Sequence, residues 1–463
     1  MKKLTWLSLL GFGLFVGLIS CWAVPTASAQ EKTLTLDEAL AKALSVNPDI
    51  IASRETAEAA GYRVGEALSG YFPQAAAVLG YKRATANAAA GPWVPKTVTS
   101  PTGKGTIPNP SAKNSVSGDS WDNYSASISV TENVYDFGKT GGAYDSADAL
   151  AKAARNDMTT AVETTYLNVT QAYFVVLAAQ ETLATARDTK KQMEYHLDLA
   201  QQQYTVGIRQ KIDVLRAQSD LAAANLSLVQ AENAQALARS NLNTAIGLNQ
   251  PADYRVEKPA ATPTITGVNI EEAYKDALAR RSDYESLQEK VVAAQAAITV
   301  ARSGYFPALG VNGSYNYTGY ETNDLVPNWN VGATLTWNFF SGLLTYRTMQ
   351  EAEANLRALQ AQKLSLELAI RSDVESAVLG YQEALAQLTP AQALYDSAKE
   401  TLTMAEERYK AGIGGIVEIT DAQTVYTQAA TGLIQANYNR ETARAKLLKA
   451  LGKISPTKAG DGK

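Results

Sequence analysis

The feature that most limits the possible folds is an internal duplication. The tetrapeptide Gly-Tyr-Phe-Pro occurs at residues 70–73 and again at 304–307, so the two copies lie 234 positions apart (304 − 70). The segments that precede them align at the same offset, since Glu38 corresponds to Glu272. Similarity over several blocks at a fixed spacing indicates a repeated structural unit. We therefore expect the chain to build one arrangement of helices and strands twice.

After the tetrapeptide the offset falls to 205, because "YTVGIRQKIDVLRAQ" (204–218) aligns with "YKAGIGGIVEITDAQ" (409–423). The difference of 29 residues (234 − 205) is assigned to a stretch rich in Pro, Gly, Ser and Thr at 84–119, which predicts a loop. Each copy is expected to contain a helix, a strand pair, a long helix and another helix. The predicted organisation is a signal peptide at 1–29, a first repeat at 34–249, a linker at 250–267, a second repeat at 268–452 and a disordered tail at 453–463.

Three segments alternate strictly between apolar and polar residues: Tyr124–Thr131, Leu309–Thr318 and Trp329–Asn338. A fourth segment, Pro73–Tyr81, alternates less cleanly. A period of two with one apolar face predicts a β-strand. A soluble β-sandwich would show the same period. Aromatic residues near the strand ends, and small polar residues instead of charges on the second face, are more typical of outer-membrane strands.

Two segments predict unusually long helices. From Lys139 to Val206 there is no proline, and apolar or small residues recur every three or four positions. A helix of about 65 residues is about 100 Å long, and such a stripe needs partner helices. The second segment, Leu343–Ala411, contains Pro390, where we expect a bend. Thr35 and Asn269 are predicted N-caps, each with a glutamate three residues later that completes a capping box.

Four strands of membrane type cannot close a barrel by themselves. An open edge in hydrocarbon leaves backbone groups unpaired at several kcal/mol each, and single-chain barrels begin at about eight strands. Several chains must therefore associate into an oligomeric pore with a helical extension. The net charge of −4, with Lys and Arg spread along the chain, argues against a nucleic-acid surface.

The N-terminus predicts export from the cytoplasm. Two lysines precede an apolar run at residues 4–24, and a small-x-small site ends at Ala29. We expect a signal peptide that is cleaved between Ala29 and Gln30. Two alternatives stay open: Leu18–Cys21 resembles a lipobox that would lead to acylation of Cys21, and the run is long enough to remain as an uncleaved anchor.

Catalysis needs a nucleophile, a base or metal ligands in matching positions, and no such arrangement is visible. The chain has one histidine, His196, and one cysteine, Cys21. We therefore predict no enzymatic activity, no cofactor and no metal site. A periplasmic coiled-coil scaffold or adaptor protein is the alternative to a pore, although the strand pairs argue against it.

The chain resembles the TolC-like outer-membrane efflux proteins from about Leu34 to Gly452. The resemblance rests on the paired blocks at 204–218 and 409–423, the two Gly-Tyr-Phe-Pro segments, and the strand ends "NVYDFG" and "NFFSG". It implies a mixed α/β membrane protein. Three chains would form one 12-stranded β-barrel in the bacterial outer membrane, with four strands from each chain. A long periplasmic α-helical coiled-coil barrel would continue it.

The resemblance also implies a function and partners. The homotrimer would be the passive exit duct of a tripartite efflux or type I secretion system. It would sit in outer-membrane lipid and bind a periplasmic adaptor (a membrane fusion protein) and an inner-membrane pump. Residue by residue, it implies a periplasmic gate at Asp213, Tyr409, Glu418 and Asp421. It implies adaptor contact at Val206, Gly207, Ile208, Ala411, Gly412 and Ile413.

Within that gate, Asp213 corresponds to the acidic hydrogen-bond partner of Tyr409; an unpaired surface aspartate is the alternative. The chain departs from the family pattern at two positions, with Ile212 in place of a threonine and Gly414 in place of an arginine. We therefore expect a second closing contact, made by an arginine, to be missing. The pair Glu418 and Asp421 would place acidic groups around the mouth of the duct.

Overall fold

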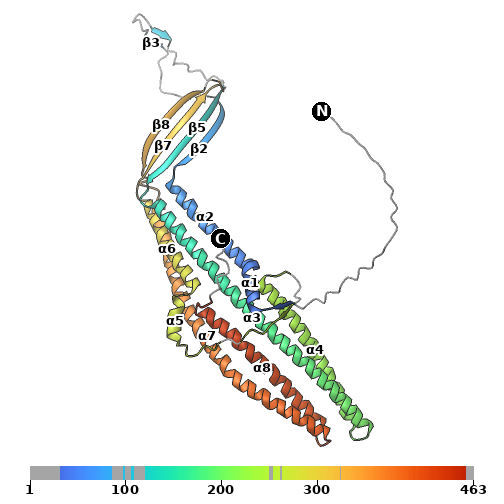
Figure 1. Ribbon diagram of the computed structural model, residues 1–463. Helices are drawn as coiled ribbons and strands as arrows, with labels where there is room; N and C mark the ends of the chain where they lie inside the picture. Colours follow the sequence, from blue (N-terminus) through green and yellow to red (C-terminus); the bar gives the residue numbers. More distant parts are fainter. Residues whose placement is uncertain are drawn as a thin grey trace, which may run out of the picture.

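The computed structural model describes residues 32–85, 97–99, 106–108, 120–249, 254–260, 263–323 and 325–454. The molecule is elongated, with a β-sheet at one end and helices that run from it to the other end (Figure 1). The predicted cleavage site at Ala29 and Gln30, Cys21, and most of the insertion at 84–119 lie outside the described residues.

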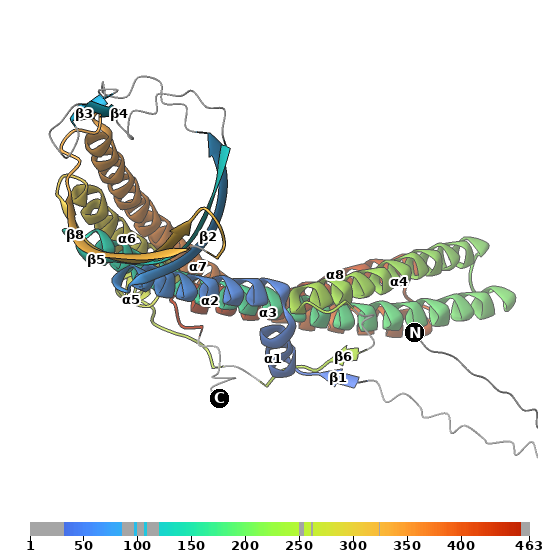
Figure 2. The same cartoon turned by 90° about the horizontal axis from the view of Figure 1, so that it is seen from above.

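Four strands form one antiparallel sheet, which confirms the strand prediction. They are β2 (Gln74–Thr85), β5 (Ser120–Tyr135), β7 (Ala308–Gly319) and β8 (Val326–Thr336), in the order β2-β5-β7-β8. The two halves of the chain meet between β5 and β7. The sheet curves into an open arc (Figure 2).

The two faces of the sheet differ in chemistry. Apolar side chains on β8 are solvent-exposed, with Trp329 74% exposed and Val331 and Leu335 similar. The opposite, polar face contributes Gln74, Asn312 and other polar groups to a hollow of about 640 Å³ at the base of the sheet. In a soluble sandwich the apolar face would be buried against a second sheet. An exposed apolar face with a polar opposite face is instead the pattern of a membrane strand.

Two 67-residue helices, α3 (Lys139–Thr205) and α7 (Leu344–Lys410), confirm the predicted long helices. The helical assignment of α7 continues through Pro390, and a hollow of about 320 Å³ lies between α7 and α8 beside that residue. Each long helix reverses into a shorter one, α4 (Lys211–Ile246) or α8 (Ile416–Ala450). We call α3 with α4 the first hairpin, and α7 with α8 the second hairpin.

Small residues recur every seventh position along the returning helices. Because a seven-residue repeat keeps one stripe facing a partner, small side chains there let two helices approach closely. The buried alanines of this stripe are Ala217, Ala224, Ala231 and Ala238 on α4, and Ala422, Ala429 and Ala436 on α8.

Each returning helix ends beneath a helix of the upper half. Gly247, at φ 91°, ends α4 so close to Asn47 that an added Cβ would lie 2.8 Å from its Cα. Asn47 is the N-cap of α2 (Pro48–Leu68). Gly452 ends α8 in the same way against Arg280, just before α6 (Ser282–Ser303). These left-handed positions require glycine, because a Cβ would be strained there.

The glycine of each Gly-Tyr-Phe-Pro segment has the same packing role. A Cβ on Gly70 would lie 3.0 Å from Cγ2 of Thr140, and a Cβ on Gly304 would lie 3.0 Å from Cγ2 of Thr345. Both threonines are in the first turn of a long helix. The tetrapeptide is repeated because each chain twice passes from a helix into the sheet against the start of its long helix.

The short helices α1 (Leu36–Val46) and α5 (Ile270–Leu278) test the capping prediction. Thr35 forms the predicted capping box with Glu38. Asn269 caps α5 by accepting from the backbone N–H of Glu271 at 3.0 Å, and no reciprocal box forms, so that half of the prediction is wrong. The Asn269 side chain accepts from the N–H of the second helical residue, Glu271, and not from that of the third, Glu272.

A parallel pair, β1 (Lys32–Leu34) with β6 (Tyr254–Val256), was not predicted.

Candidate functional site

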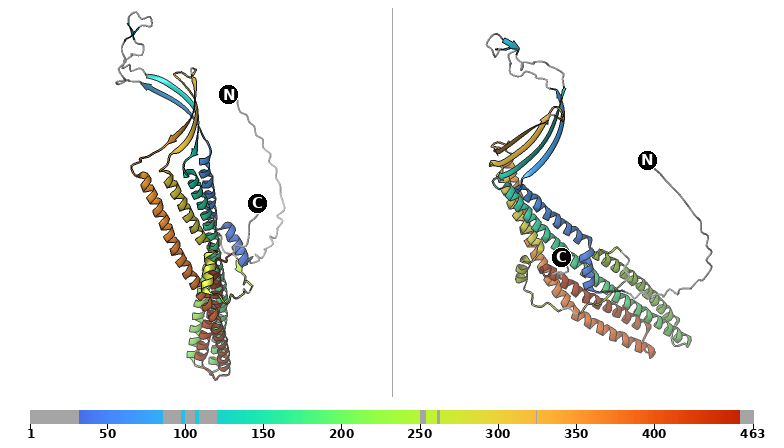
Figure 3. Two further views of the ribbon diagram at one scale, coloured as in Figure 1. Left: turned by 90° about the vertical axis from the view of Figure 1, so that its left-hand side faces the viewer. Right: turned by 45° about the horizontal axis from the view of Figure 1, so that its top comes forward.

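The two helical hairpins end in turns of the same backbone form. In the first turn Gly207 N–H donates to Tyr204 C=O at 3.0 Å, and in the second Gly412 N–H donates to Tyr409 C=O at 3.0 Å. Gly207 and Gly412 have φ of 75° and 78°, a left-handed conformation that suits glycine after a helix end. Both turns lie at the end of the molecule away from the sheet (Figure 3). We call this end the tip.

The tip presents apolar side chains to solvent. Val206 and Ile208 in the first turn and Ile413 in the second are exposed, with Ile413 71% exposed. The other predicted adaptor positions, Gly207, Ala411 and Gly412, are exposed between them. The six residues therefore form two neighbouring apolar projections at the helix ends.

Tyr409 is fully buried at the tip, whereas its counterpart in the first copy, Tyr204, is 45% exposed. It packs in a cluster with Leu402, Ala405, Ile416, Ile419 and Ala422. The Tyr409 hydroxyl has no hydrogen-bond partner among the described residues. Burial raises the pKa of that hydroxyl, Arg209 opposes the rise, and Asp213 adds to it.

The predicted hydrogen bond between Asp213 and Tyr409 is therefore not made in this structure. Asp213, in the first turn of α4, is close enough to act on Tyr409 through its charge. The aromatic ring is covered instead by Arg209, whose guanidinium carbon lies 4.8 Å from the ring centroid. The Arg209 guanidinium therefore covers the Tyr409 ring, and Asp213 acts on Tyr409 only through its charge.

An arginine contact does occur at the tip, although it does not come from position 414, where the chain has glycine. Nη2 of Arg209 donates to the backbone C=O of Gly414. Arg209 and Gly414 are counterparts at the 205-residue offset (414 − 209), so the arginine is present in the first turn and absent from the second. The alignment of the two blocks already places Arg209 opposite Gly414, but it does not show that the two residues are in contact.

The two other predicted gate acids differ in their surroundings. Nε of Arg408 lies 2.9 Å from a carboxylate oxygen of Glu418, and both side chains are about half exposed. Asp421 is exposed one turn further along α8. Glu418 is therefore partly neutralised within its own hairpin, and the fuller negative charge belongs to Asp421.

The contact between the hairpins is polar and poorly satisfied. Within the described ranges, eleven buried side-chain nitrogen and oxygen atoms lack a hydrogen-bond partner. Eight of them lie in the half of the hairpins towards the tip. The sequence did not predict this concentration of unsatisfied polar atoms. Buried polar atoms without partners are rare and costly, so they oppose the folded arrangement in this half of the hairpins. The residues are Thr189, Gln192, His196 (both ring nitrogens), Gln203, Arg209, Tyr409 and Gln423.

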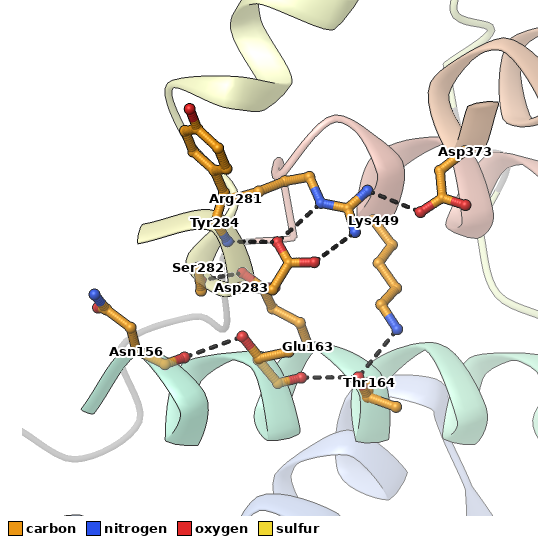
Figure 4. A network of polar contacts seen from close by, with 10 residues as sticks. Asn156, Glu163, Thr164, Arg281, Ser282, Asp283, Tyr284, Asp373 and Lys449 are labelled. Atoms are coloured by element: carbon orange, nitrogen blue, oxygen red, sulfur yellow. Dashed lines mark hydrogen bonds and ion pairs between the residues drawn. The ribbon is translucent and has the colours of Figure 1, made fainter. Parts of the chain in front are cut away.

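A second polar cluster joins four helices at the middle of the molecule (Figure 4). Arg281 binds Asp283 through Nη2 at 2.7 Å and Asp373 of α7 through Nη1 at 3.1 Å. Ser282 donates to buried Glu163 of α3 at 3.1 Å, and Lys449 of α8 donates to Thr164.

Burial raises the pKa of Glu163 and lowers that of Lys449. These partners all belong to the chain itself, so the cluster fastens α6 onto α3, α7 and α8. Sequence reasoning missed it, because its members are far apart along the chain.

No group of three or more His, Cys, Asp and Glu side chains suited to a metal occurs in the part of the chain that is described. Over the same residues, no helix is both long and apolar enough to cross a membrane.

A family model described as "Outer membrane efflux protein" matches residues 39–248 and 273–453. The pyoverdine export outer membrane protein OpmQ of Pseudomonas aeruginosa is 26% identical over 339 residues, which are 72% of this chain and 71% of that protein. Outer membrane protein TolC of Vibrio cholerae is 27% identical over 332 residues, covering 67% of this chain and 73% of that protein.

The Campylobacter jejuni CmeC outer membrane channel has a similar fold, with a TM-score of 0.77 over 90% of this chain and 85% of that chain at 20% identity. These matches confirm the predicted resemblance and the fold class of sheet plus helical hairpins. The alternative of a coiled-coil scaffold is not supported.

Proposed function

Because the chain belongs to the outer membrane efflux protein family, we propose that three copies of it form one exit duct through the outer membrane. The duct would conduct substrates passively from an inner-membrane pump and a periplasmic adaptor to the exterior, in a tripartite efflux or type I secretion system. This family consists of transport channels, and the proposed role needs neither a catalytic residue nor a cofactor.

The observation that carries the proposal is the pair of open sheet edges. In the described sheet β2 pairs only with β5, and β8 pairs only with β7. In hydrocarbon each unpaired backbone group costs several kcal/mol, so both edges must be covered. The edge β2 of one copy can pair with β8 of the next, since the two strands run in opposite directions. Three copies of four strands would then close a barrel of about twelve, within the size range of membrane barrels.

The helices have open sides that match those of the sheet. In the upper half α2 packs on α3, α3 on α6 and α6 on α7, which leaves α2 and α7 at the two sides. In the lower half α4 packs on α3, α3 on α8 and α8 on α7, which leaves α4 and α7. Two different sides meeting head to tail give a ring when the rotation closes. The same ring would therefore continue from the sheet to the tip.

The tip is the proposed gate and docking point. Six exposed tip residues, Val206, Gly207, Ile208, Ala411, Gly412 and Ile413, are the proposed contact with the adaptor, because exposed apolar projections mark interaction sites. The buried Tyr409 ring would hold the closed form, and Asp213 would act on it only through its charge. Glu418 and Asp421 would line the mouth and favour cations, since low-dielectric walls focus the field of a ring of carboxylates.

Native mass measurement and planar-bilayer recording of detergent-extracted protein test the duct. We expect a trimer with steady conductance; a monodisperse monomer would refute the proposal. The substitution Val331→Lys should impair membrane insertion, because a lysine on a lipid-facing strand costs about 2–4 kcal/mol at the membrane centre. The matched control is Asn328→Lys, on the polar face of the same strand, which should insert normally.

Replacement of Tyr409 tests the gate separately. Tyr409→Ala removes the largest buried side chain of the tip cluster and should raise single-channel conductance. Tyr409→Phe removes only a hydroxyl that has no hydrogen-bond partner in this structure, so it should change conductance much less. Equal conductance in the alanine variant and the wild type would mean that Tyr409 does not hold the duct closed.

A further inference from the structure

We propose that Arg209 latches the two hairpins together at the tip, by binding the Gly414 carbonyl and covering the Tyr409 ring of the second hairpin. Arg209 belongs to no predicted set of site residues. The proposal rests on the proposed function for its effect on conductance, and on the geometry of one chain for the latch itself.

Both contacts of Arg209 cross from the first hairpin to the second. Its Nη2 donates to the C=O of Gly414, and its guanidinium carbon lies 4.8 Å from the centroid of the Tyr409 ring. The backbone of Arg209 is held by its own turn, because its N–H donates to the C=O of Gln203 at 3.2 Å. The side chain therefore extends from a fixed point in one turn to two fixed points in the other.

Arginine suits this pair of contacts better than any other residue. Its planar guanidinium can donate a hydrogen bond in the plane while its face covers an aromatic ring, whereas lysine is a point charge and cannot do both. Nε of Arg209 is buried without a hydrogen-bond partner. The guanidinium is therefore partly shielded from water at a site where the ring and the carbonyl dipole stabilise it.

Gly414 is the matching half of the latch. An added Cβ at this position would lie 3.1 Å from the backbone nitrogen of Tyr409 and 3.2 Å from Cβ of Arg408, closer than most real Cβ contacts. A larger residue would push the second turn away from Tyr409. The two turns share one backbone form but differ at this position. The first turn supplies the arginine, and the second supplies the glycine that leaves room for it.

The test compares Arg209→Ala, Arg209→Lys and Gly414→Ala with wild type in the full-length, detergent-extracted protein. Amide hydrogen exchange is measured in the turns 206–210 and 411–415, and single-channel conductance is recorded in parallel. All three variants should exchange at least about tenfold faster at the turns, since each removes or displaces at least one of the two contacts of Arg209 between the hairpins. The control is Arg216→Ala, which removes the same charge from an exposed position on α4 and should exchange like wild type.

The outcomes separate the latch from the duct. Wild-type exchange in Arg209→Ala, or the same acceleration in Arg216→Ala, would overturn the latch while a conducting wild type would leave the duct intact. Wild-type exchange in Arg209→Lys would also overturn it, because the account needs both contacts. If the wild-type protein does not conduct but Arg209→Ala loosens the turns, the duct fails and the latch stands.

Discussion

His196 is the residue through which acid should loosen the contact between the hairpins. It is 3% exposed on α3, and neither ring nitrogen has a hydrogen-bond partner within the part of the chain that the structure describes. Glu406 and Lys410 face it from α7, with Nε2 of the ring 3.6 Å from a Glu406 oxygen, and Asp220 acts on it from α4. Burial first, and then Lys410, lower the pKa of His196 below its ordinary value of 6.5, while Asp220 raises it.

The sign of the pH effect follows from that shift. Below pH 6.5 the unfolded chain binds a proton that the folded ring resists, so the contribution of His196 to stability is complete above pH 6.5. It is lost as the pH falls from there towards the folded pKa, by at most about 1.4 kcal/mol per pH unit. Burial gives Glu406 the opposite shift, since its pKa is raised above 4.5, so its protonation favours the folded state as the pH falls.

The substitution His196→Leu should remove this response and tighten the contact. Each buried nitrogen without a partner costs about 1–3 kcal/mol, and an apolar side chain of similar size leaves none. The protection of amides in residues 190–205 and 400–410, after correction for the intrinsic exchange rate at each pH, should fall from pH 8 to pH 5 in the wild type and stay nearly constant in the variant. The control is Glu406→Gln, which removes the opposing titration and should steepen the wild-type response. If His196→Leu and wild type follow the same pH profile, the histidine is not the proton-sensitive group.

The tip, its acids and the middle of the molecule give three further predictions. Gly412→Ala should destabilise the second turn by about 1 kcal/mol, because φ is positive there, and should weaken adaptor binding in a pull-down. Gly432→Ala, at a helical position with room for a Cβ, should leave binding unchanged. Asp421→Asn should raise the concentration of trivalent cation that blocks the conductance more than Glu418→Gln does, because Arg408 already compensates Glu418; an equal effect would contradict this ranking. Glu163→Gln should raise the melting temperature more at pH 7.5 than at lower pH, because the buried carboxylate, with its raised pKa, is costly only when ionised; a lower melting temperature at pH 7.5 would contradict that reading.

Local patterns predicted most of the fold. The period of two in residues 309–318 and 329–338 placed β7 and β8 within a few residues, because each strand presents one face to an apolar medium. The proline-free stretch from Lys139 placed α3 to within one residue at its C-terminal end. The helix α7 continues through Pro390, where local rules predict a bend, and a hollow lies between α7 and α8 beside that residue.

The candidate site was predicted less completely. The glycine turns at Gly207 and Gly412 could be read directly, because a left-handed residue after a long helix needs glycine. The partner of Tyr409 could not, since the sequence does not say whether Asp213 or Arg209 occupies the approach to its ring. The polar cluster around Arg281 was not predicted either, because its members come from four helices and lie far apart along the chain.

By itself the sequence determined the elements that depend on neighbours along the chain: the strands, the two long helices, the Thr35 cap and the two glycine turns. It also determined that these elements occur in the same order twice. Only the tertiary structure decided how the two copies differ. Tyr204 and Tyr409 stand at equivalent positions in turns of one backbone form, yet one is exposed and the other is fully buried. The reason is that a backbone turn is set by local sterics, whereas burial depends on which hairpin packs over the other, and that contact joins residues about two hundred positions apart.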